Sequence, residues 1–116
     1  MNLPNAVRVR YDNLRSLDWS LVGVNYAAIG TPFSHPLRLL KLSNGTDANM
    51  LISLNGLDDV DVLYANSYCL YDFSSNKATQ GGYLELAAGE RIYIKAEDNL
   101  PGAGVIYVTC LYASQV

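Results

Sequence analysis

Short apolar runs separated by polar turns make up most of the chain, and the region from Leu37 to Asp72 shows this pattern most clearly. Apolar runs within residues 37–44 and 49–56 flank a polar break at residues 45–48 that contains a glycine. Two such runs around a four-residue connection predict a β-hairpin. A third apolar run continues to Asp72, so we expect a three-stranded meander whose pattern the rest of the chain repeats.

Alternation within these runs predicts which side chains face the core. Met50, Ile52 and Leu54 share one face of their run, and we expect that face to be buried. Between Leu37 and Leu42 the alternation slips, because leucines fall on both faces. Either a bulge or a strand that is covered on both faces would explain the slip.

The same reasoning divides the rest of the chain. Strands are expected at residues 6–11, 21–29, 60–64, 67–73, 83–86, 91–97 and 105–113, with loops at 30–36, 74–82 and 98–104. Leu14, Leu17 and Leu21 lie at helical spacing, which predicts one or two helical turns within residues 13–21. With no long helix, the pattern predicts an all-β fold, an antiparallel β-sandwich of jelly-roll form.

The chain length of 116 residues predicts one domain. We expect residues 1–36 to form an N-terminal arm and packing segment and residues 37–116 to form the sandwich. The alternation is cleanest in residues 91–97, where Ile92, Ile94 and Ala96 are expected to point inward.

The last expected strand, residues 105–113, is apolar on both faces. One face carries Val105, Tyr107, Thr109 and Leu111, and the other carries Ile106, Val108, Cys110 and Tyr112. A strand of an antiparallel sandwich normally turns one face to water. Either the N-terminal third covers this strand, or the strand lies in an interface between subunits.

Composition favours a subunit of an assembly. Charged residues make up 16% of the chain, against about 25% in an average soluble protein, and hydrophobic residues make up 50%. The net charge is −3 and the eight basic residues are scattered, which argues against nucleic acid as a partner. No run approaches the roughly 20 apolar residues of a membrane span. The absence of a visible signal peptide and the two cysteines, expected to be buried free thiols, predict synthesis in a cytoplasm without secretion.

Few residues suggest chemistry. The single histidine, His35, lies in a loop between Ser34 and Pro36 with no evident catalytic partner. Asp58, Asp59 and Asp61 form an acidic turn that is expected to be solvated, with a calcium site as the less favoured alternative. No phosphate-binding glycine loop or nucleophile motif is present, so we expect a protein that is not an enzyme and needs no cofactor.

The nine tyrosines are the most unusual feature of the sequence. They are consistent with an interface, with the edge of the core, or with a platform for stacking sugars. The residues expected to form an interface are Tyr64, Tyr68, Tyr71, Tyr93, Val105, Tyr107, Leu111 and Tyr112.

A string of short motifs runs through most of the chain, from Ile29 to Ala113. It comprises Ile29-Gly30-Thr31-Pro32, residues 37–42 with Asn44, Thr46-Asp47, Ile52-Ser53, Leu70-Tyr71-Asp72, Asn76-Lys77, Gly81-Gly82, Ala88-Gly89, Ile92-Tyr93-Ile94-Lys95, Val105-Ile106-Tyr107-Val108-Thr109 and Tyr112-Ala113. This order resembles that of small virion structural proteins of tailed bacteriophages. The chain departs from the pattern at residues 57–60, where a histidine-containing turn is expected.

The resemblance implies an all-β accessory protein of the virion, either a capsid cement or decoration protein or a component of the head–tail neck. Its expected partners are further copies of itself, in a trimer or ring, and a capsid or neck protein. The alternative is a carbohydrate-binding β-sandwich whose exposed tyrosines stack on sugar rings.

Overall fold

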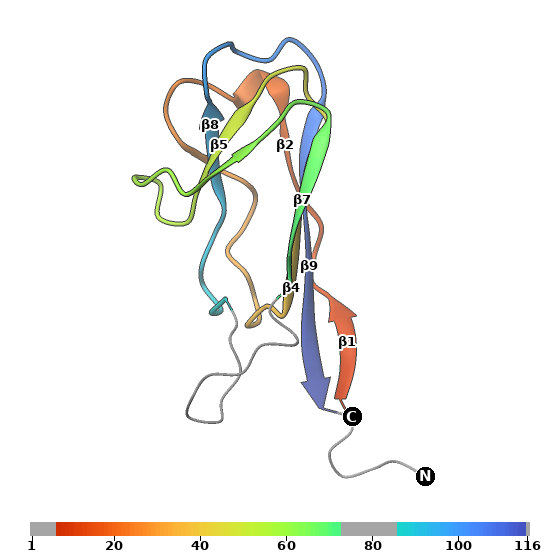
Figure 1. Ribbon diagram of the computed structural model, residues 1–116. Helices are drawn as coiled ribbons and strands as arrows, with labels where there is room; N and C mark the ends of the chain where they lie inside the picture. Colours follow the sequence, from red (N-terminus) through yellow and green to blue (C-terminus); the bar gives the residue numbers. More distant parts are fainter. Residues whose placement is uncertain (1–6, 73–85, 116) are drawn as a thin grey trace.

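The protein is built from two antiparallel sheets with no α-helix in the part described by a computed structural model, which covers residues 7–72 and 86–115 (Figure 1). The first sheet contains β1 (Val7–Tyr11), β2 (Arg15–Asp18), β4 (Leu39–Asn44), β7 (Ser67–Asp72) and β9 (Val105–Gln115). The second contains β3 (Ala27–Ala28), β5 (Met50–Ser53), β6 (Asp61–Leu63) and β8 (Tyr93–Ala96). The all-β prediction is therefore confirmed for these residues. Within them, no helix is long and apolar enough to cross a bilayer.

Strand pairing follows a nested pattern. β5 pairs with β6, β4 with β7, β3 with β8 and β2 with β9, all antiparallel. These pairs lie alternately in the second and the first sheet, as if one long hairpin with its tip at β5–β6 were rolled over two layers. The ladders β4–β9 and β5–β8 then join neighbouring pairs into sheets with the orders β1-β9-β4-β7 and β3-β8-β5-β6, and β2 also pairs with β9.

The predicted hairpin at residues 37–56 is wrong, because β4 and β5 belong to different sheets. Residues 45–49 cross between the layers, and a buried polar group holds the crossing. The Asn44 side-chain amide donates to the main-chain oxygens of Ala48, Leu63 and Tyr64 at 2.9, 3.2 and 3.2 Å. Its side-chain oxygen accepts from the main-chain N–H and the hydroxyl of Thr46 at 2.9 and 2.6 Å. The meander also fails, since only β5 and β6 form a hairpin.

The core lies between the sheets, and the alternation predicts much of it. Met50, Ile52, Ile92, Ile94 and Ala96 are buried as expected. Leu54 is not, because the chain leaves β5 after Ser53 and turns outward.

The slip between Leu37 and Leu42 has a simpler cause than a bulge. β4 begins only at Leu39 and alternates regularly, with Leu40 and Leu42 inward. Leu37 precedes the strand and is fully buried in an isolated bridge to Leu86.

Residues 13–29 also depart from prediction. The expected helical turns reduce to one 3₁₀ turn, η1 (Trp19–Leu21), because β2 takes residues 15–18. Leu17 in β2 is buried, whereas Leu14 before the strand and Leu21 in η1 are exposed. The three leucines therefore do not share one face, despite their helical spacing. The strand expected at 21–29 shrinks to the two residues of β3. The loop at 74–82 and most of the strand at 83–86 lie outside the described residues.

Candidate interaction surfaces

The outer face of the first sheet is apolar and aromatic. Through the strand registers, the residues that share this face include Tyr11, Leu39, Lys41, Ser43, Tyr68, Leu70, Asp72, Val105, Tyr107, Thr109 and Leu111. Tyr11, Tyr68 and Leu70 are each more than half exposed. On β4, β7 and β9, the described part of this face carries only Lys41 and Asp72 as charged residues.

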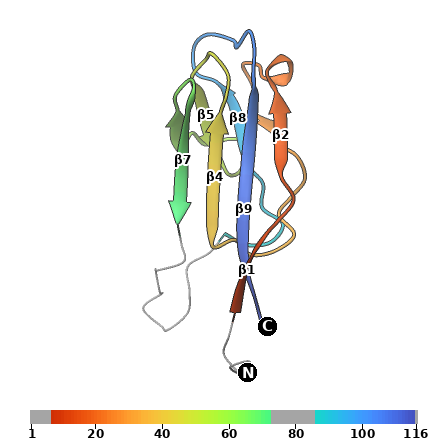
Figure 2. The same cartoon turned by 90° about the vertical axis from the view of Figure 1, so that its right-hand side faces the viewer.

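No described segment lies over this outer face, which is turned toward the viewer in Figure 2. β1 and β2 pair with the edge of β9, so these two N-terminal strands lie beside β9 rather than over its outer face. Three apolar residues of β9 on its inner face, Ile106, Val108 and Cys110, are buried in the core. Its outer face, with Tyr107 and Leu111, is not covered by any described segment.

Two tyrosines on the outer face flank a shallow groove of about 350 Å³. Ser43 pairs with Tyr107 on one neighbouring strand and with Tyr68 on the other. The tyrosines therefore stand two strand spacings apart, roughly 10 Å. The Lys41 ammonium lies 5.6 Å from the centre of the Tyr68 ring. The groove thus has aromatic residues on both sides and polar groups between them.

A second hollow opens between the two sheets where β6 and β7 form their edges. This edge pocket has a volume of about 190 Å³ and is lined by Leu40, Leu42, Ile52, Leu54, Val60, Asp61, Tyr71, Leu86 and Ile92. Its lining is almost wholly aliphatic. The one charged residue in the lining, Asp61, accepts a hydrogen bond from the Tyr71 hydroxyl. Burial is the main cause that raises the pKa of Tyr71, and the hydrogen bond to Asp61 raises it further.

The eight predicted interface residues do not form one patch. Tyr68, Val105, Tyr107 and Leu111 share the outer face of the first sheet, whereas Tyr71 lines the edge pocket.

The other three predicted interface residues lie elsewhere. Tyr112 stacks on His35 with ring centres 3.7 Å apart, which gives the only histidine a packing role. Tyr93 is half-buried on the second sheet beside Gly56, and Tyr64 is exposed after β6.

The structure does not bring the three acidic residues of the turn together. Asp58 accepts from the Asn55 amide at 2.8 Å. Asp59 accepts from the Tyr26 hydroxyl, which lowers the Asp59 pKa, and lies 3.5 Å from Lys95. Asp61 is paired with Tyr71 as described above. Among the residues that the structure describes, no three His, Cys, Asp or Glu side chains are grouped as a metal site would require.

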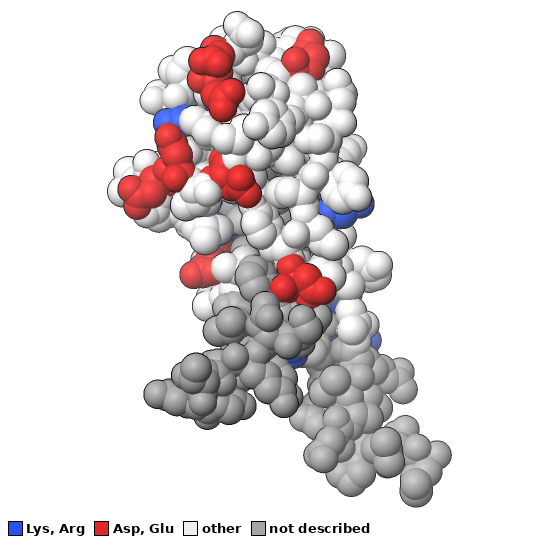
Figure 3. Space-filling view, viewed as in Figure 1, with Lys and Arg blue, Asp and Glu red and all other residues white. Residues whose placement is uncertain are grey.

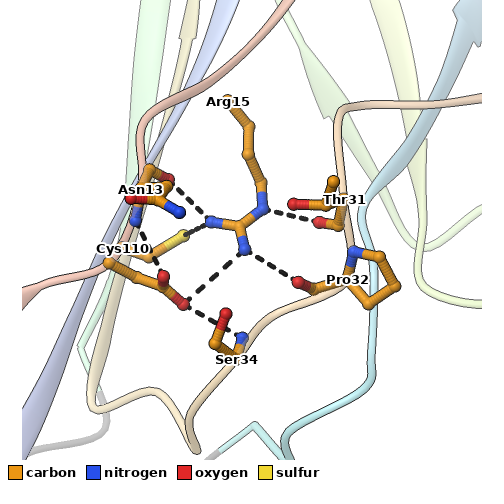
Figure 4. A network of polar contacts seen from close by, with 7 residues as sticks. Asn13, Arg15, Thr31, Pro32, Ser34 and Cys110 are labelled. Atoms are coloured by element: carbon orange, nitrogen blue, oxygen red, sulfur yellow. Dashed lines mark hydrogen bonds and ion pairs between the residues drawn. The ribbon is translucent and has the colours of Figure 1, made fainter.

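Arg15 is a buried residue that sequence reasoning missed (Figure 4). Its guanidinium donates to the main-chain oxygens of Thr31, Asn13 and Pro32 at 2.6, 2.7 and 2.8 Å. It also lies 3.8 Å from the Cys110 sulfur and 3.6 Å from an Asp12 carboxylate oxygen.

Four of these contacts are hydrogen bonds and the contact with Asp12 is an ion pair. Because Arg15 is also only 3% exposed, its guanidinium is committed to its own chain rather than to a ligand. We assign it a structural role, tying β2 to the loop at residues 30–36. Arg15 and Leu17 are two residues apart in a strand, so they share a face, and the apolar Leu17 was the signal that this face points inward.

Both cysteines are free thiols in the described structure. Cys110 is buried as predicted, whereas Cys69 is only partly buried. Burial raises the pKa of Cys110 to about 11, and burial also raises that of Cys69. Each is therefore a protonated, weakly nucleophilic thiol near neutral pH.

Comparison of the chain with protein-family models, with curated proteins and with solved structures finds no match. The resemblance to virion proteins therefore stays a prediction.

Proposed function

We propose that this protein is a non-enzymatic structural subunit of a phage virion, which forms a homo-oligomer and binds the capsid or the head–tail neck through the outer face of its first sheet. The observation that carries the proposal is the apolar, aromatic character of that face. Covering a large apolar side chain is favourable by about 1.5–3 kcal/mol. A face with Tyr68, Leu70 and Tyr107 uncovered is suited to burial against a partner.

We also propose that the fold is a jelly roll. The nested pairing of β2 with β9, β3 with β8, β4 with β7 and β5 with β6 supports this assignment, since a jelly roll is a double-sheet form of eight strands. Jelly rolls occur in viral capsid proteins and in lectins. The fold is compatible with a virion role, but a fold alone does not decide function. The virion itself enters the proposal through the sequence resemblance.

The proposal is tested by co-sedimentation with particles that lack this protein. Leu70→Asp places a charge on the outer face, and Leu100→Asp places one on an equally exposed loop leucine elsewhere. We expect wild type and Leu100→Asp to sediment with the particles and Leu70→Asp to remain in solution. Equal sedimentation of both variants would show that the outer face is not the contact, and no sedimentation of any form would contradict the proposal.

The second candidate is a carbohydrate-binding module, and the groove between Tyr68 and Tyr107 favours it. Two aromatic rings beside hydroxyl groups and an ammonium match the requirements of a sugar, which stacks its apolar face and hydrogen-bonds through its hydroxyls. A glycan array tests this candidate. It predicts binding that Tyr68→Ala and Tyr107→Ala abolish and that Tyr64→Ala keeps. A blank array with the wild-type chain would exclude it for the glycans presented.

A further inference from the structure

The turn between β5 and β6, residues 54–60, is held rigidly and projects from the body of the molecule (Figure 1). The Ser53 hydroxyl oxygen accepts from the main-chain N–H of Asn55 and Gly56 at 3.3 and 3.0 Å. The Asn55 side-chain oxygen accepts from the main-chain N–H of Leu57 and Asp58 at 2.8 and 2.9 Å. This turn has a defined shape before any partner arrives.

Leu57 lies within this turn with 81% of its surface exposed, more than any other large apolar residue among those described. Because hydrogen bonds hold the shape of the turn, Leu57 cannot fold back onto the protein, and its apolar side chain stays in contact with water at a cost in free energy. The arrangement is suited to a residue that is buried against another molecule.

The base of the same turn opens into the edge pocket. Leu54 and Val60, at the two ends of the turn, line the pocket and are 41% and 56% exposed. The pocket volume of about 190 Å³ exceeds that of an engineered cavity of roughly 150 Å³ that takes up benzene. It is large enough for one leucine side chain, and its aliphatic lining matches that side chain.

We propose that the edge pocket of each copy holds Leu57 of a neighbouring copy. This inference rests on the homo-oligomer of the proposed function and names the contact that builds it. The projecting leucine and the apolar pocket lie on one continuous surface, joined by Leu54 and Val60. A surface that carries both complementary parts can pair reciprocally with a second copy, or pass the contact on around a closed ring.

Charge is compatible with this contact when the solution contains salt. Acidic side chains are spread over this side of the molecule (Figure 3). The two carboxylates of the turn and the adjacent Asp61 of β6 already accept from donors within their own chain: Asp58 from Asn55, Asp59 from Tyr26 and Asp61 from Tyr71. Repulsion between copies remains, so we expect association to strengthen as the ionic strength rises.

Light scattering on the purified full chain tests the proposal. The wild-type chain is expected at a multiple of 12.7 kDa. Leu57→Asp removes the inserted side chain, and Leu54→Trp fills the mouth of the pocket from its rim. Each is expected to weaken self-association by about tenfold or more. Leu100→Asp, an exposed leucine outside this surface, is the matched control and keeps the wild-type mass.

Cross-linking tests the geometry without changing the fold. A mixture of Leu57→Cys and Val60→Cys chains is expected to form a disulfide between different chains, and a mixture of Leu100→Cys and Val60→Cys chains is not. Leu57→Asp chains that keep the wild-type mass would overturn the inference, as would a wild-type chain at 12.7 kDa at every concentration. Native mass spectrometry that finds a small molecule bound to wild type and absent from Leu54→Trp would also overturn it.

The pocket contact and the particle contact can be tested independently of each other. If Leu57→Asp dissociates the oligomer but still sediments with particles, the pocket contact is supported independently of the outer face. If Leu70→Asp loses particle binding but keeps its mass, the outer face is the particle contact and self-association uses another surface.

Discussion

Arg15 shows how one residue can hold a region with little secondary structure. The loop at residues 30–36 has no regular strand pairing over most of its length, so its main-chain oxygens need other donors. The guanidinium supplies them at Thr31 and Pro32, and Asp12 accepts from the main-chain N–H of Ser34 at 3.1 Å on the other side. Lysine could not replace this arginine, because an ammonium lacks the planar set of five donors.

Replacing Arg15 by methionine is expected to destabilise the protein by about 3–5 kcal/mol. The methionine keeps the length of the side chain but leaves three main-chain oxygens without their donor and the Asp12 carboxylate without its counter-charge. Urea unfolding at pH 7 measures the loss. Arg10→Met is the control at an exposed arginine and should change the free energy of unfolding by less than about 0.5 kcal/mol. Equal effects of the two variants would contradict the structural role of Arg15.

Asp12 is expected to make the free energy of unfolding fall as the pH becomes acidic. Burial acts to raise its pKa, but hydrogen bonds from the Asn13 and Ser34 N–H groups, together with Arg15, bring it below the ordinary value of 3.8. A carboxyl with a lower pKa in the folded state contributes its full stabilisation above the unfolded pKa. That stabilisation is lost as the pH falls through the folded pKa.

The measurement is the urea midpoint between pH 7 and pH 2. Asp12→Asn should lose less stability than wild type over the acid range below about pH 4. Asp18 and Asp59 also have lowered pKa values, and they are present in both proteins. Identical acid slopes for the two proteins would show that Asp12 contributes nothing to acid sensitivity.

At the scale of elements, alternation predicts strands and their buried faces, but not which sheet each strand joins. β8 and β9 lie where the sequence predicts them, with Ile94 and Ile106 inward. The break at residues 45–48 has the composition of a hairpin turn, yet Asn44 directs its hydrogen bonds to Leu63 and Tyr64 across the layers. Such partners are distant in sequence, so local turn chemistry does not reveal them.

The same limit applies to the candidate surfaces. The tyrosines of β7 and β9 are recognisable from sequence, but their approach to one another depends on β4 lying between them. The edge pocket depends on Leu86 meeting Leu40 and Ile52 through long-range packing. The inward direction of Arg15 was visible only as alternation with one leucine, because an arginine is usually assigned to the surface.

The chain crosses between the sheets at residues 45–49 and again at residues 97–104, and the two crossings approach each other where Gly104 lies against Gly45. This close approach leads to a prediction for Gly104. Gly104 has a φ of +101°, and a Cβ there would lie 2.1 Å from the main-chain oxygen of Gly45. Gly89 has a φ of +92° but open space around it.

Gly89→Ala should cost about 1–2 kcal/mol from strain alone, whereas Gly104→Ala should cost about 3 kcal/mol or more because the backbones must separate. Thermal unfolding of both variants measures the difference. A Gly104→Ala protein as stable as Gly89→Ala would show that the crossings do not approach closely.

At the scale of the whole molecule, the two candidate surfaces are different in character. The outer face of the first sheet is broad, aromatic and nearly free of charge over β4, β7 and β9. The edge pocket and the turn at residues 54–60 are narrow, aliphatic and flanked by carboxylates. The proposed subunit contacts its own copies through one surface and a larger particle through the other, so it needs two such surfaces. The low overall charge of the chain is consistent with covering both.

Hydroxyl-radical footprinting of the free and the particle-bound chain tests the central claim most directly, since tyrosine and tryptophan side chains are labelled in proportion to their exposure. Trp19 is a suitable internal control, because its 39% exposure is close to the 41% of Tyr107. We predict that Tyr68 and Tyr107 are labelled in the free chain and protected on the particle, while Trp19 is labelled in both. Equal labelling of Tyr68 and Tyr107 in the two states would contradict the assignment of the outer face as the docking surface.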